Sequence, residues 1–348
     1  MARMTTVSIE GDSFYINGKA TYDGCTFNGM KIEGLLMNSR MVQATFDDLN
    51  SQTREQWRFP DGAPFDANRN TSEFIAMMPE YRRRGLLAVT LNLQGGSPYG
   101  YSDAQPWHNS AIEADGTVRA DYLSRLERVL DRADELGMVI ILGLFYFGQD
   151  ERVADEAAVV RGVQNATDWL VTKAYTNVLV EITNEADVKR YEHPILTDKR
   201  CHELIELVQQ RSCGKVANPK GRLLAGTSMS GGTIPPDAIV AVSDFILPHG
   251  NGVREPSRIR EMCDEVRALG SYRGQPIFFN EDDHFDFDKG DNNMLAAIGK
   301  HASWGFFDYR MKGEGFEQGY QSIPADWGIN SARKKGFFDL TAKVTGAR

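Results

Sequence analysis

The feature that most constrains the fold is an alternation of short apolar runs with segments of helical period along nearly the whole chain. The runs are almost unbroken in apolar residues, as is typical of parallel strands buried on both faces. Eight such runs occur, at 31–37, 86–93, 138–147, 178–182, 223–225, 245–247, 276–279 and 304–307. Helices are expected between them and near the C-terminus, at 71–84, 121–137, 196–211, 255–269, 292–302 and around 334–340.

Eight buried strands alternating with helices in a chain of 348 residues predict an α/β fold of the (β/α)8 type, a TIM barrel. A doubly wound open sheet is the alternative, but it often carries a dinucleotide fingerprint after its first strand, and this sequence has none. Residues 1–25 predict a short N-terminal β-hairpin with a turn signal at Asn17-Gly18. No linker or internal repeat divides the chain, so we expect one domain over 1–348, with the barrel at 26–348.

Composition and charge limit the classes of partner that the chain is expected to bind. Thirty-nine Lys and Arg against forty-eight Asp and Glu give a net charge of −9, and no dense basic patch indicates a nucleic-acid partner. No apolar run approaches the roughly 20 residues of a membrane span, so we expect no membrane partner. No secretory signal is visible, which predicts a cytoplasmic location, or a secreted or periplasmic one if a leader has been removed. The four cysteines show no metal-binding spacing, and nothing indicates an oligomeric state.

Two glutamates end apolar runs that lie three strands apart. Asn184-Glu185 follows the fourth run, and Glu281 follows the seventh. Packing does not need a carboxylate at the carboxyl end of a barrel strand, and burying one is costly. Glycosidic cleavage does need such a pair, because one group protonates the leaving oxygen while the other attacks the anomeric carbon. We therefore expect Glu185 and Glu281 to face each other across the barrel mouth as catalytic residues.

These two motifs resemble those of clan A of the glycoside hydrolases, the group that includes the family 5 cellulases and mannanases. The resemblance covers nearly the whole chain as architecture, although only the two motifs are specific. It implies that Glu185 is the acid/base, that Asn184 binds the sugar 2-hydroxyl and that Glu281 is the nucleophile of a retaining enzyme without a cofactor. The pattern's arginine on the second strand is replaced by Asn92, and its histidine after the third strand by the stretch around Tyr146. This chain therefore looks like a divergent member.

Further substrate-binding residues are expected around the pair. Arg40, after the first strand, is expected to hold the nucleophile ionised. Two long loops follow early strands, and their aromatic residues either wall a sugar cleft or pack within the loops. The clan often has a histidine after the sixth strand and a sugar-stacking tryptophan on the eighth, although core packing is the alternative for that tryptophan. The candidates are Arg40, Asn92, Trp107, His108, Tyr146, Asn184, His249, Asp283, His284 and Trp304.

The sequence thus predicts a retaining glycoside hydrolase that acts on a carbohydrate by double displacement. A transglycosylase with the same residues differs only in its acceptor. A non-catalytic carbohydrate-binding barrel is a third possibility, although binding alone does not require a carboxylate pair. A fourth is a metal-dependent hydrolase using the acidic stretch after Glu281, but no metal-binding motif accompanies that stretch and we expect no metal.

Overall fold

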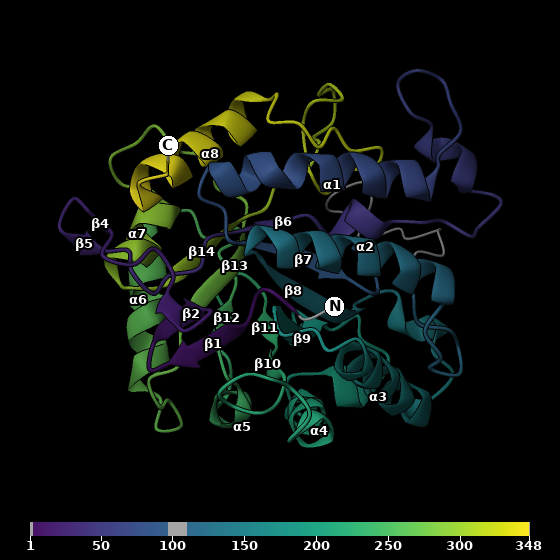
Figure 1. The fold of residues 1–348 in the computed structure, drawn as a ribbon, viewed down its shortest axis with the longest axis horizontal. Helices are drawn as coiled ribbons and strands as arrows, with labels where there is room; N and C mark the ends of the chain where they lie inside the picture. The colour runs from purple at the N-terminus through teal and green to yellow at the C-terminus, as the bar shows by residue number, and fades with distance from the viewer. Residues whose placement is uncertain (1–2, 97–109, 348) are drawn as a thin grey trace.

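The computed structural model of the chain describes residues 3–96 and 110–347, in which strands at the centre are surrounded by helices (Figure 1). The strands of the central layer are β6 (Asn38–Arg40), β7 (Ala88–Asn92), β8 (Val139–Tyr146), β9 (Val178–Asn184), β10 (Leu224–Gly226), β13 (Phe278–Asp282) and β14 (Ser303–Phe306). They form one parallel sheet in the order β10-β9-β8-β7-β6-β14-β13. The helices are α1 (Ala67–Arg83), α2 (Ala120–Leu136), α3 (Glu156–Thr172), α4 (Cys201–Ser212), α5 (Asp237–Val242), α6 (Pro256–Ala268), α7 (Asn293–Gly299) and α8 (Ala332–Thr345).

The segment 244–250 lies between the two ends of this sheet and hydrogen-bonds to both. On one side, β12 (Leu247–Pro248) pairs with β11 (Ser228–Met229), which follows β10 directly. On the other side, the backbone N–H of Phe278 in β13 donates to the carbonyl of Ile246 at 2.8 Å. The curled parallel sheet is therefore compatible with a (β/α)8 barrel in which 244–250 takes the place of the sixth strand.

The N-terminal segment covers the end of the strands that lies opposite their carboxyl ends. Strands β1 (Val7–Glu10) and β2 (Ser13–Ile16) lie side by side (Figure 1) and pair antiparallel. Strand β3 (Lys19–Ala20) pairs with β2 and extends this small sheet. Val7 and Phe14 pack into one apolar cluster with residues from the starts of the barrel strands, including Val139, Leu179 and Phe278. A second small hairpin, β4 (Thr26–Phe27) with β5 (Met30–Lys31), follows.

The first strand begins later than the sequence predicts. The apolar run 31–37 was expected to be that strand, but β6 spans only Asn38–Arg40. Gly34 explains the difference, because its φ of +87° is a conformation that interrupts a strand, and its backbone hydrogen-bonds to Phe14 and Thr21 of the N-terminal segment. Residues 31–37 are thus a buried connection between the hairpins and the sheet.

The helical predictions succeed where the apolar period is clear. Helix α2 ends at Leu136, and Gly137 adopts a left-handed φ of 67° as its cap. Helix α3 was not predicted, and its sequence contains Gly162 and several valines, which have lower helix propensity. Among the described residues, no helix is long and apolar enough to cross a membrane.

Candidate active site

Five polar side chains meet at the carboxyl ends of the central strands. Arg40 ends β6, Asn92 ends β7, Tyr146 ends β8, Asn184 ends β9, and Glu281 lies one residue before the end of β13. Carboxyl ends of parallel strands face the same side of a barrel, which is the side where barrel active sites lie. The strands thus bring together residues that are up to 241 positions apart, the difference between 281 and 40.

Glu185 and Glu281 form the centre of this site. A carboxylate oxygen of each, together with a ring nitrogen of His249, lies within 4.8 Å of the others. The side chain of Glu185 is 12% exposed and that of Glu281 is 4% exposed, so both are nearly enclosed by described residues. A separation of about 5 Å between two carboxyl groups suits direct attack on an anomeric carbon, whereas a water-mediated attack requires a wider gap.

Glu281 is held by a cation and an amide. Arg40 places its Nε 2.6 Å from Glu281 Oε2, and its Nη2 donates to Asn184 Oδ1 at 2.5 Å. Asn251 donates its side-chain amide to Glu281 Oε1. Burial alone would lower the pKa of Arg40, but the charges of Glu281 and Glu181 outweigh it and raise that pKa. The guanidinium therefore remains charged and compensates the carboxylate beside it.

Glu185 has different surroundings. Its partner is the buried imidazole of His249, whose Nδ1 lies 2.9 Å from Glu185 Oε1 and 3.7 Å from Glu281 Oε2. Burial raises the pKa of Glu185, and the hydrogen bond with His249 opposes this rise without cancelling it. For His249, burial would lower the pKa, but the charges of Glu281 and Glu185 prevail and raise it. The two carboxyls thus have different surroundings, because Glu281 lies beside a guanidinium and Glu185 is buried against an imidazole and has a raised pKa.

The backbone of Glu185 is in an unusual conformation. Strand β9 ends at Asn184, and Glu185 has a φ of 54°, in the left-handed region that non-glycine residues seldom adopt. Its N–H donates to Ser228 Oγ at 2.9 Å, and Tyr191 donates its hydroxyl to the carbonyl of Asn184. Such strain costs about 1–3 kcal/mol and is typical of functional sites, where surrounding contacts hold it in place.

Several buried polar atoms around the pair have no hydrogen-bond partner among the described residues. Buried polar groups are nearly always paired, so a group of unpaired ones indicates a place where a ligand or water completes the bonding. These atoms point to a site that binds hydroxyl groups. They are both side-chain atoms of Asn92, Asn184 Nδ2, His249 Nε2, Asn251 Oδ1, Asn280 Oδ1, Glu181 Oε1 and Arg40 Nη1.

Tyr146 completes one wall of the site. Burial and the charge of Glu281 raise the pKa of its phenol, so the hydroxyl stays protonated and can donate a hydrogen bond. Its ring centroid lies 4.4 Å from that of Phe147.

Two residues of the site were not predicted from the sequence. Asn251 follows the predicted His249, and its contact with Glu281 depends on the loop conformation, which the sequence does not reveal. Glu181, four residues before Glu185, is fully buried beneath the pair and accepts a hydrogen bond from Asn280 Nδ2 at 3.2 Å. A charged residue in the middle of an otherwise apolar run was the signal that could have identified it.

Glu181 should make stability depend on pH. Burial raises its pKa, while Arg40 and His249 oppose the rise. A raised pKa in the folded state means that stability is fully present below the unfolded value, near 4.5, and is lost as pH rises through the folded value. In Glu181→Gln this loss should vanish, so the free energy of unfolding should fall less between pH 5 and 8 than it does in the wild type.

Urea unfolding at the two pH values measures this change. Glu10→Gln, at an exposed carboxylate on β1, is the control and should retain the wild-type dependence. If the free energy of unfolding depended on pH identically in wild type and Glu181→Gln, a raised pKa of Glu181 could not be the cause of that dependence.

Trp304 does not line the site, which corrects the sugar-stacking role expected for it. The indole is fully buried on the outer side of the strand, against Phe287 and against Phe337 of α8. Its Nε1 donates to Asp282 Oδ2 at 2.9 Å. Alternation along β14 explains the placement, because a residue that points toward the helices cannot also face the barrel mouth.

Trp304→Ala should therefore destabilise the fold rather than weaken substrate binding. We expect a loss of about 3–5 kcal/mol in the free energy of unfolding, as for other large aromatic residues removed from a core. Urea unfolding gives the loss, and Trp304→Phe should give a smaller one because it keeps most of the packing. A variant of wild-type stability with a raised KM would restore the stacking role.

Other expected site residues lie at the edge of the site or outside the described chain. Asp283 accepts the backbone N–H of Gly252 at 3.0 Å, which joins it to the loop that carries His249. His284 contacts Asp282 through Nδ1 at 2.7 Å, and that carboxylate raises its pKa although burial opposes the rise. Trp107 and His108 lie outside the described residues.

Two groups of described side chains have the spacing of metal ligands. One is Glu185, His249 and Glu281, and the other is Asp282, Asp283 and His284. In the first group, the Arg40 guanidinium already occupies the position beside Glu281 where a cation would compensate its charge. In the second, Asp282 is fully buried and its oxygens accept hydrogen bonds from Trp304, Asn293 and His284. Both groups are thus bonded internally in ways that a metal would disrupt.

Comparisons with known proteins agree with the architecture. No protein-family model matches the sequence, and a search of curated proteins finds no match. Among solved structures, the endo-1,4-β-mannanase of Rhizomucor miehei is similar over 99% of this chain and 100% of its own, with a TM-score of 0.58 and 11% identity. A glycoside hydrolase family 5 protein of Bacteroides vulgatus is similar over 97% of this chain and 70% of its own, with a TM-score of 0.57 and 12% identity.

A further putative glycoside hydrolase of Bacteroides vulgatus has a TM-score of 0.57 and 13% identity over 93% of this chain. This chain spans 58% of the length of that protein. At such low identities the likeness concerns the fold alone. The chain thus shares its fold with structures of family 5 glycoside hydrolases.

Proposed function

We propose that the protein is a retaining glycoside hydrolase built as a single (β/α)8 domain with an N-terminal hairpin. The observation that carries the proposal is the pair Glu185 and Glu281, with carboxylate oxygens within 4.8 Å of each other at the carboxyl ends of the strands. The two groups have different surroundings, because Glu281 lies beside a guanidinium and Glu185 is buried against an imidazole. That difference supports different roles for the two carboxyls.

In the first step, the Glu281 carboxylate attacks the anomeric carbon, while Glu185 donates its proton to the leaving oxygen and the glycosidic bond breaks. Arg40 and Asn251 keep Glu281 in position for this attack. In the second step, Glu185 removes a proton from water, which attacks the anomeric carbon and releases Glu281. Two inversions at one carbon give net retention of configuration.

The unpaired amides of Asn92 and Asn184 support a role in binding sugar hydroxyls, because such groups offer both donors and acceptors. The hydroxyl of Tyr146 is protonated and lies near Glu281, so it can donate a hydrogen bond to an oxygen of the bound sugar. The compared structures include mannanases and endoglucanases. A β-1,4-linked mannan or glucan is therefore the first substrate class to test.

The stereochemistry of the product tests the mechanism. In proton NMR of the reaction, the sugar released first should have the same anomeric configuration as the substrate. A 2-deoxy-2-fluoro glycoside with a good leaving group should accumulate as a covalent adduct on Glu281, found by mass spectrometry of the digested protein. An inverted first product, or an adduct on another residue, would show the mechanism to be wrong. Full activity after dialysis against a chelator is expected, and its loss would favour the metal-dependent alternative.

A further inference from the structure

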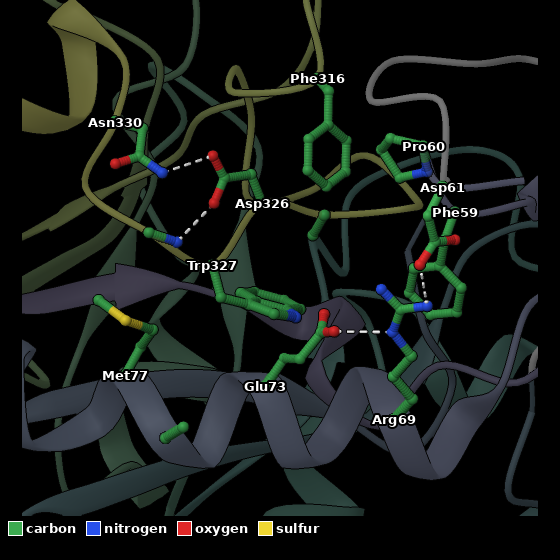
Figure 2. Close-up of a pocket in the computed structure, with 13 residues that line it drawn as sticks. Phe59, Pro60, Asp61, Arg69, Glu73, Met77, Phe316, Asp326, Trp327 and Asn330 are labelled. Carbon is green, nitrogen blue, oxygen red and sulfur yellow. Dashed lines mark hydrogen bonds and ion pairs between the residues drawn. The ribbon is translucent and has the colours of Figure 1, made fainter. Parts of the chain in front are cut away.

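A cavity of about 530 Å³ lies on the carboxyl-end side of the strands, between α1 and two loops (Figure 2). One loop follows β6 and contributes residues 59–61, and the other follows β14 and contributes residues 316, 325–328 and 330. Ligand sites usually measure about 300–1,000 Å³, so the cavity is large enough for a small molecule. Within the described part of the chain, the side chains that bond to Glu185 or Glu281 do not line it.

Aromatic side chains form two sides of this cavity. Phe316 is half-buried and points toward Trp327, whose indole lies on the other side (Figure 2). Trp327 is fixed in place, because its Nε1 donates to Asn70 Oδ1 at 3.1 Å and its ring stacks on Tyr320. Trp327 is only 2% exposed, so it forms a fixed and nearly covered side of the cavity. The half-buried ring of Phe316 is the aromatic face that a ligand with an apolar side can contact.

Polar groups line the remaining sides and are held in position by one another. Arg69 bonds to Asp61 at 2.8 Å and to Glu73 at 2.8 Å, while Asp326 accepts from Asn330 Nδ2 at 2.8 Å (Figure 2). Each carboxylate has two oxygens and several lone pairs, so each can still accept a hydrogen bond from a ligand.

The charge and the aromatic surface of the cavity restrict the kind of ligand that it can bind. Three carboxylates and one guanidinium give the cavity a net negative charge, which disfavours phosphates and acidic sugars. A purely apolar ligand would desolvate the carboxylates without offering them donors. A neutral sugar ring satisfies both requirements, because its C–H face packs on an aromatic ring while its hydroxyl groups donate to carboxylates.

We propose that this cavity binds a neutral sugar unit of a polymeric substrate, away from the bond that is cleaved. Strands β6 and β14, whose loops form the cavity, are neighbours in the sheet, and Arg40 at the end of β6 contacts Glu281. A long glycan can thus contact both places on the same side of the molecule. The choice of carbohydrate as the ligand rests on the proposed glycosidase function.

Filling the cavity tests the proposal. Ala76 is exposed on α1 and lines the cavity, so Ala76→Trp should fill it without removing a contact of the fold. Phe316→Ala removes one aromatic wall. Lys335→Trp adds the same indole to an exposed position of α8 outside the cavity and is the matched control. Binding of mannohexaose and cellohexaose is measured by calorimetry on the full chain carrying Glu281→Gln, which prevents turnover.

The hexasaccharide that binds more tightly should lose about tenfold in affinity in Ala76→Trp and in Phe316→Ala, and none in Lys335→Trp. In chains with Glu281 intact, the ratio of kcat/KM on the polymer to that on an aryl glycoside should fall by a similar factor. Unchanged affinity in both folded variants would overturn the proposal, as would the absence of binding of either hexasaccharide to the Glu281→Gln chain. The proposed catalytic function fails separately, because it is measured on the aryl glycoside and on Glu281.

Discussion

Replacing Glu281 with alanine should lower kcat/KM on every glycoside by about 10⁴-fold or more, which corresponds to about 5 kcal/mol of transition-state stabilisation. The variant lacks the oxygen that forms the covalent intermediate, and no other described carboxylate can replace it. Glu185 faces His249 rather than Arg40, and Glu181 is buried beneath both. Initial rates on an aryl glycoside measure the loss.

Added azide should restore part of the activity of Glu281→Ala, because a small anion fits the space that the side chain vacates. The glycosyl azide should have the inverted configuration, since only one displacement then occurs. Asp286→Ala, at an exposed carboxylate five residues further along, is the control and should keep wild-type rates. Full activity of Glu281→Ala would rule out its role as nucleophile.

Glu185→Ala should lose about 10²- to 10⁴-fold in rate, and the size of the loss should depend on the leaving group. A poor leaving group needs a proton from Glu185, whereas dinitrophenolate departs without one. Rates on a series of aryl glycosides with different phenol pKa values measure this dependence. The dependence should be steep for Glu185→Ala and shallow for the wild type. An equal loss on all substrates would contradict the acid role.

The pH profile gives a second test of Glu185. Burial raises its pKa, so the proton that it is proposed to donate is retained at pH values above those at which an exposed glutamate is ionised. The rate of the wild type should fall on the basic side as this proton is lost. With a dinitrophenyl glycoside, Glu185→Ala should lack that basic limb. Glu185→Gln, which keeps the shape of the side chain, should lack it as well.

Much of the fold could be predicted because burial on both faces leaves a clear pattern in the sequence. The runs that became β7, β8, β9 and β13 are nearly continuous in apolar residues, and α2 shows its period and its glycine cap. The first strand was misplaced because the run 31–37 is equally apolar but packs against the N-terminal hairpin. Apolar content predicts burial, and only long-range pairing decides whether a buried segment becomes a strand.

The site could be predicted in part, and the limit again lies in long-range geometry. Glu185 and Glu281 stand out because each follows an apolar strand, and their positions along the chain place them on the same side of the barrel. Asn251 depends on a loop conformation that leaves no pattern in the sequence. Trp304 was expected to contact the sugar but is buried against the helices. The sequence places it on the eighth strand but does not reveal which face of that strand it occupies.

The segment that takes the place of a sixth strand is a weak point of the curled sheet, and it lies next to the candidate active site. Strand β12 has only two residues, and one of them, Pro248, has no N–H to donate across the seam. Local opening of such a short element requires less free energy than global unfolding. The residues that follow it include His249, which contacts Glu185, and Asn251, which contacts Glu281, the two carboxyls proposed as catalytic. Heating should therefore open the contacts of segment 244–250 with β11 and β13 first. The protein should then lose activity before the remaining strands separate.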